Sequence, residues 1–64
     1  MLSFSEAQRK NELLEKFRRE NMLTKPEAEE LKQLIQKDNS MDAAVKALLI
    51  FALGALIGYL LTRR

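Results

Sequence analysis

The sequence has 64 residues, no cysteine or histidine, and a net charge of +2. The absence of both residue types excludes a disulfide framework, a thiolate zinc site and most catalytic or metal-binding constellations. A chain of this length is one structural unit, too small to bury a large core in water without help. We therefore expect a protein that is not an enzyme and that uses no cofactor or metal.

The charges are unevenly distributed along the chain. Up to Asp42 there are eight basic and nine acidic residues, so this part is close to neutral. The other basic residues are Lys46, Arg63 and Arg64, which lie in or beside an apolar C-terminal segment. This pattern is typical of a membrane flank and argues against nucleic acid as a partner.

The first predicted element is a helix over residues 4–20. Ser3 and Glu6 have the spacing of a capping box, in which each side chain bonds the backbone N–H of the other residue. Acidic and basic residues four positions apart predict three ion pairs on its surface, Glu6–Lys10, Glu12–Lys16 and Glu15–Arg19. Its apolar stripe consists of Leu13, Leu14 and Phe17.

A second helix is predicted over residues 25–37. Asn21 suits a left-handed position at the end of the first helix, and Thr24 and Glu27 repeat the capping box. The apolar stripe of the second helix consists of Leu31, Leu34 and Ile35. Together these signals predict a helical hairpin within residues 1–39.

The predicted hairpin has about eight apolar side chains, too few for it to be stable alone. Its two stripes therefore need a third surface, which a second copy, a partner protein or the face of a bilayer could supply. The basic residues of the first helix could contact phosphate groups, although the interleaved glutamates favour a solvated face of ion pairs. These residues are Arg9, Lys10, Lys16, Arg18 and Arg19.

The C-terminal segment, residues 40–64, predicts a single transmembrane helix. Lys46 is the one charged residue between Ala43 and Thr62, and about 20 helical residues span roughly 30 Å, the thickness of a bilayer core. Its Leu, Ile, Val and Phe residues favour insertion by about 3 to 6 kcal/mol. Lys46 lies near the start, where its amine can reach the headgroups or pair with a carboxylate of a partner helix.

The residues that flank this helix predict its limits and orientation. Tyr59 suits the far interface, and Arg63 and Arg64 keep the end of the segment in water. Asn39 or Ser40 is expected to cap the helix. More basic residues precede the helix than follow it, which favours a cytosolic N-terminus. No signal peptide is apparent, and the layout is that of a tail-anchored protein.

Small residues mark one face of the predicted transmembrane helix. Ala43, Ala47, Gly54 and Gly58 fall on this face, and the two glycines form a GxxxG motif. Such a face permits close contact with another helix, although glycine is also simply common in membrane helices. The large side chain of Phe51 interrupts this face. The motif therefore leaves open whether another helix binds to it.

Two stretches resemble known protein families. One lies in residues 52–64, ALGALIGYLLTRR, and resembles the C-terminal anchor of the ElaB/YqjD-type proteins, bacterial tail-anchored proteins associated with ribosomes. The other lies in residues 14–35, LEKFRRENMLTKPEAEELKQLI, and is similar to the hairpin of the short C-terminal (SHOCT) oligomerisation module. Leu23, Thr24 and Glu27 match the turn of that module. Both resemblances imply assembly rather than catalysis.

The sequence as a whole predicts an all-α, single-pass membrane protein that acts by protein–protein interaction. The favoured role is an accessory or scaffold subunit whose hairpin docks on a cytosolic surface. The expected partners are membrane lipid and either another membrane-protein subunit or a second copy of the chain. A self-assembling viral coat or holin-like protein, and a membrane tether for ribosomes or RNA, are the alternatives.

Overall fold

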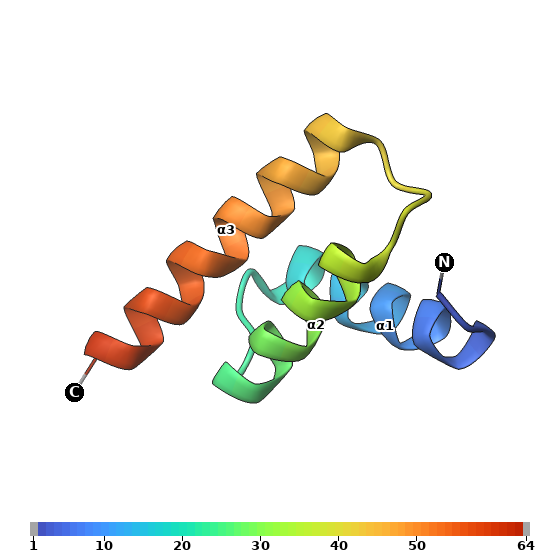
Figure 1. Cartoon of the computed structure of the whole chain (residues 1–64). Coiled ribbons are helices and arrows are strands. Elements are labelled where there is room, and N and C mark those ends of the chain that lie inside the picture. Colours follow the sequence, from blue (N-terminus) through green and yellow to red (C-terminus); the bar gives the residue numbers. More distant parts are fainter. Residues whose placement is uncertain (1, 64) are drawn as a thin grey trace.

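The structure is a computed structural model that describes residues 2–63, in which three α-helices are the regular elements (Figure 1). Helix α1 comprises Phe4–Glu20, α2 comprises Lys25–Lys37, and α3 comprises Ala43–Thr62. The all-α class, with a helical hairpin followed by one helix long and apolar enough to span a membrane, is confirmed.

The capping boxes predicted for the hairpin are present at both helix starts. The Ser3 hydroxyl accepts the Glu6 N–H at 3.2 Å, and the Ser3 N–H donates to the Glu6 carboxylate at 3.0 Å. Thr24 and Glu27 repeat this arrangement at 3.3 and 3.0 Å. These reciprocal bonds satisfy amide donors that have no partner inside a helix, which explains why α1 and α2 begin where they do.

Helix α3 is capped by a residue other than the predicted Asn39 or Ser40, so that prediction was wrong. The Asp42 carboxylate accepts the N–H groups of Ala44 and Val45 at 2.9 and 3.3 Å. Ser40 instead donates its N–H and hydroxyl to the carboxylate of Asp38. A carboxylate complements the positive end of the helix dipole better than a neutral cap, and Asp42 directly precedes the helix.

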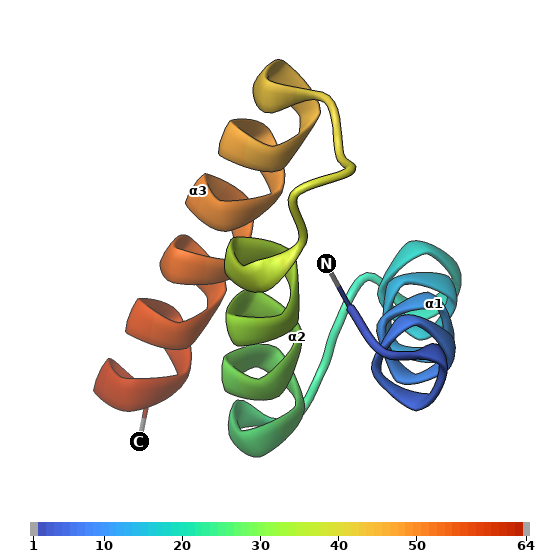
Figure 2. The ribbon, with the colours of Figure 1, turned by 45° about the vertical axis from the view of Figure 1, so that its right-hand side comes forward.

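Helix α2 occupies the centre of the structure, and both other helices pack against it. Figures 1 and 2 show α3 running back alongside α2 in the opposite direction, with the connection between them at one end. In Figure 2, α1 lies on the other side of α2 from α3. The helix expected to cross a membrane is thus in contact with the hairpin.

One apolar core joins all three helices. Leu13 of α1, Leu31 and Ile35 of α2, and Leu53 of α3 are at most 1% exposed. Leu23 and Ala28, which flank the start of α2, belong to the same core. The third surface that the hairpin stripes require is therefore supplied, in this structure, by α3 of the same chain.

The turn of the hairpin depends on a left-handed residue. Asn21 has φ 56° and ψ 25°, and its N–H donates to the Phe17 carbonyl at 2.7 Å, as predicted for a helix C-terminus. A β-branched residue is strained in this conformation by about 1–2 kcal/mol, whereas glycine is not.

We expect Asn21→Val to lower the stability of the fold by about 1–2 kcal/mol because of this strain, and Asn21→Gly to leave it unchanged or slightly raised. Thermal unfolding followed by circular dichroism in detergent-free buffer measures both. Equal stability of the valine and glycine variants would show that the left-handed turn is absent.

Candidate functional site

The most prominent surface of the molecule is the outward face of α3, which is apolar and exposed. Leu48, Phe51 and Leu61 are 70%, 78% and 63% exposed. Only 6% of the most apolar stretch of α3 is buried, so most of this stretch is at least partly exposed. A continuous apolar face of this length is characteristic of a surface that meets lipid or another protein.

The small-residue face of α3 is open in this structure. Ala43, Ala47 and Gly58 are exposed and Gly54 is partly exposed. A Cβ atom added to either glycine would meet no atom within 4 Å. The glycines therefore do not serve the packing of α3 on α2, and their contact with another helix stays a prediction.

The predicted membrane-flank residues lie at both ends of α3. Lys46 is partly buried, and its Nζ donates to the carbonyl oxygen of Asp38 at 3.0 Å. Tyr59 is exposed, and the Arg63 N–H closes the helix on the Tyr59 carbonyl at 2.9 Å. Arg64 lies outside the described residues.

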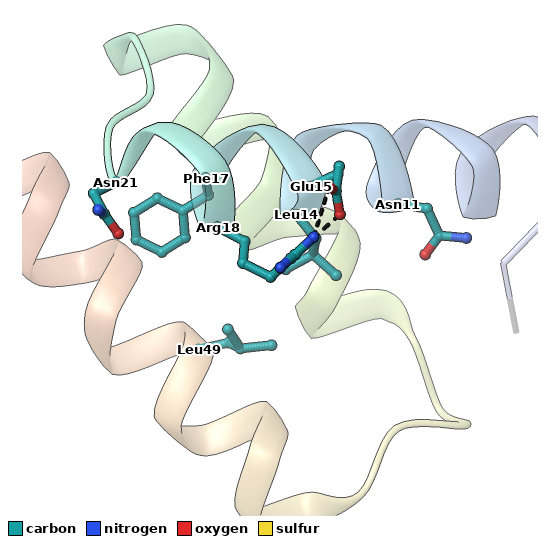
Figure 3. Close-up of a pocket in the computed structure, with 7 residues that line it drawn as sticks. All are labelled: Asn11, Leu14, Glu15, Phe17, Arg18, Asn21 and Leu49. Atoms are coloured by element: carbon teal, nitrogen blue, oxygen red, sulfur yellow. Dashed lines mark hydrogen bonds and ion pairs between the residues drawn. The ribbon is translucent and has the colours of Figure 1, made fainter.

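A shallow groove lies between α1 and α3, with a volume of about 660 Å³ (Figure 3). Leu14 and Phe17 of α1 and Leu49 of α3 form its apolar lining. Its polar rim consists of Asn11, Glu15, Arg18 and Asn21. An apolar floor with a polar rim is the composition of a site that accepts apolar side chains of a partner.

The six residues predicted as a partner-packing stripe divide between two places. The structure brings Leu13, Leu31, Leu34 and Ile35 together in the core. Leu14 and Phe17 pack against this core, are partly buried and line the groove of Figure 3. These two residues of α1 are the part of the predicted stripe that stays partly accessible.

Ion pairs between α1 and α2 hold the hairpin closed. Arg9 binds Glu30 through two bonds of 3.0 and 3.2 Å, and Lys16 binds both carboxylate oxygens of Glu27 at 2.9 and 2.8 Å. At the other end of the hairpin, Glu6 binds Lys37 and Lys10 binds Asp38. The antiparallel packing of the two helices places each of these charges opposite a charge of the other helix.

These contacts overturn the three ion pairs predicted within α1. Glu6, Lys10 and Lys16 are each engaged with a residue of α2 or its C-cap, and Glu15 binds Arg18 rather than Arg19. Pairs four residues apart on one exposed helix contribute only a few tenths of a kcal/mol. An ion pair between two packed helices is partly shielded from water, which strengthens the attraction between its charges. This explains why Glu6, Lys10 and Lys16 pair with residues of α2 or its C-cap and not within α1.

The ion pairs also occupy the basic residues that could have bound phosphate. Arg9, Lys10 and Lys16 face carboxylates of the hairpin, as described above, and Arg18 lies 2.7 Å from Glu15. Arg19 lies 3.6 Å from Glu20. These contacts favour the solvated, ion-paired face over a phosphate-binding one.

Asp38 is a structural residue whose importance the sequence did not reveal. It is 2% exposed, and its carboxylate accepts bonds from Lys10 and Ser40 while its carbonyl accepts the bond from Lys46. The Lys10 ammonium and then Ser40 hold the pKa of Asp38 well below its ordinary value. Asp38 thus joins α1, the α2–α3 connection and the start of α3.

The two capping glutamates are held ionised by the opposite helix. The Lys37 ammonium, assisted by the Ser3 N–H, lowers the pKa of Glu6 from 4.5 to about 2. The Lys16 ammonium, assisted by the Thr24 N–H, lowers the pKa of Glu27 from 4.5 to about 2. Carboxylates fixed in this state are structural anions rather than proton donors near neutral pH.

These pKa values predict acid sensitivity of the hairpin. Because the folded pKa of Glu6 and Glu27 lies below the unfolded value, the stabilisation is complete above about pH 4.5 and is lost as the pH falls towards 2. We expect the melting temperature, measured by circular dichroism in detergent-free buffer, to fall over this range. The double variant Lys16→Met/Lys37→Met should show a smaller fall, and a melting temperature that is constant from pH 5 to pH 2 would contradict the ion pairs.

Comparison with known proteins identifies no relative of the chain. No protein family, curated protein or solved structure matches the chain. Its function is therefore inferred from its own residues and their geometry.

Proposed function

We propose that α3 crosses a membrane once and that the hairpin binds another protein beside that membrane, as an accessory or scaffold subunit of a membrane complex. The observation that carries this proposal is the exposed apolar face of α3, with Leu48 and Phe51 at 70% and 78% exposure. Water strongly disfavours such a surface, and a bilayer accommodates it.

The orientation proposed places the hairpin in the cytosol. The basic residues near the start of α3 are Lys25, Lys32, Lys37 and Lys46, against Arg63 and Arg64 after it. Short segments that flank a membrane helix carry more lysine and arginine on the cytosolic side than on the other side. In this orientation, the charged hairpin does not have to cross the bilayer.

Binding rather than chemistry is the proposed activity of the hairpin. Its capping and buried carboxylates, those of Glu6, Glu27 and Asp38, are fixed by ammonium groups and backbone donors. Leu14 and Phe17 belong to α1 and are partly exposed, so they stay with the hairpin when α3 is in the membrane and are accessible to a partner. A partly exposed aromatic side chain is a typical anchor of a protein interface.

Affinity purification from native membranes in a mild detergent tests this proposal. We expect a foreign membrane-associated protein to co-purify with the wild type, and Phe17→Glu to weaken its binding by at least about 2 kcal/mol. Gln8→Glu, at an exposed position of α1 outside the groove, is the matched control and should retain the partner. Recovery of the chain alone would contradict the accessory role.

Self-assembly in the membrane is a second candidate, supported by the open Gly54–Gly58 face. Small residues without neighbours allow the backbone of a second helix to approach closely. Under this proposal, identical α3 helices would pair through Gly54 and Gly58.

Cross-linking of the purified protein in mild detergent tests self-assembly. Since a Cβ atom at either glycine would meet no atom within 4 Å, Gly54→Ile and Gly58→Ile should abolish an oligomer without disturbing the fold. Ala55→Ile, at an exposed position outside the small-residue face, should leave the oligomer intact. A wild-type protein that stays monomeric would contradict the second candidate and leave the first.

A further inference from the structure

The packed side of α3 is a defined stripe along the helix. Leu53 is fully buried, and Leu49, Ile50, Leu56 and Ile57 pack against the same core. Their spacing of three and four residues places them on one side of the helix, opposite the exposed Phe51. The hairpin therefore covers one side of α3 and leaves the other bare.

This packing is incompatible with insertion of α3 into a bilayer. Ile57, in the apolar second half of α3, lies in the same surface hollow as Glu29, Lys32, Gln33 and Gln36 of α2. With α3 inserted, these charged and amide side chains would lie at the depth of the hydrocarbon. Charged and amide side chains are strongly disfavoured there.

We propose that the hairpin is a binding surface for its own membrane helix: in water it covers one side of α3, and α3 leaves it to enter a bilayer. This inference deepens the proposed function and rests on its membrane-spanning helix. The core face of α2 and the hydrocarbon are thus two mutually exclusive environments for the same residues of α3.

The connection between α2 and α3 is suited to such a release. The Lys46 Nζ holds the start of α3 to the Asp38 carbonyl at 3.0 Å, while the Asp38 carboxylate stays bound to Lys10 and Ser40. Release of α3 breaks the bond from Lys46 and leaves the rest of this cluster in place. The freed ammonium, at the start of the span, then reaches the lipid phosphates.

The bare side of α3 provides the first contact with the membrane. Leu48, Phe51 and Leu61 face water while the packed side is still covered. Adsorption of this face buries apolar surface before α3 separates from the hairpin. The packed form therefore presents the bilayer with the face that favours insertion.

A reversible cross-link between the hairpin and α3 tests the proposal. Glu20 and Arg63 are both exposed and line one hollow at the far end of α3, and the chain has no cysteine of its own. The Glu20→Cys/Arg63→Cys variant is joined in detergent-free buffer by a short bis-maleimide with a reducible linker. It is then added to vesicles of phosphatidylcholine and phosphatidylglycerol, and insertion is measured as flotation that resists alkaline carbonate.

We expect the cross-linked protein to lose carbonate-resistant insertion and to regain it when the linker is reduced. Arg9→Cys/Glu30→Cys, joined in the same way, is the matched control because those residues are in contact within the hairpin. This control should insert whether or not it is cross-linked.

Three results would overturn the proposal, and they are distinguishable. Failure of the Glu20–Arg63 cross-link to form in water would show that α3 does not lie on the hairpin. Equal insertion of the cross-linked and reduced forms would show that release is not required. Failure of the reduced form and of the control to insert would refute the membrane-spanning role itself.

Discussion

A helix of twenty residues with one charge cannot be covered on all sides by a hairpin of this size, and α3 is packed on one side alone. Leu53 is buried among residues of all three helices, while Phe51, two positions away, is 78% exposed. Leu53 lies in the same core as Leu31 and Ile35 of α2. The fold of the hairpin and the exposure of α3 are thus consequences of the same contact.

Electrostatics and capping reinforce one another in the hairpin. Glu6 and Glu27 each complete a capping box and bind a lysine of the other helix. The start of each helix is therefore fixed by the partner helix as well as by its own first turn. This double use links the start of each helix to the other helix of the hairpin.

Local signals predicted the hairpin well, because caps, the left-handed Asn21 and the helix periods act over a few residues. Leu13, Leu31 and Ile35 were recognised as apolar stripes for the same reason. The partners of Glu6, Lys10 and Lys16 were missed since they lie more than ten residues away in sequence. Asp38 was missed because a buried aspartate in a polar connection looks, in sequence, like any loop residue. The packing of α3 on α2 was unforeseen because a helix apolar all round does not mark the side that packs.

In the mechanism proposed above, the apolar core of α2 holds α3 in water and not in a bilayer. Nuclear Overhauser contacts between the methyl groups of Leu53 and those of the hairpin core report this packing directly. We expect such contacts in detergent-free buffer and their replacement by contacts from Leu53 to lipid chains in bicelles. Leu53 contacts with the hairpin that persist in bicelles, or that are absent in water, would contradict it.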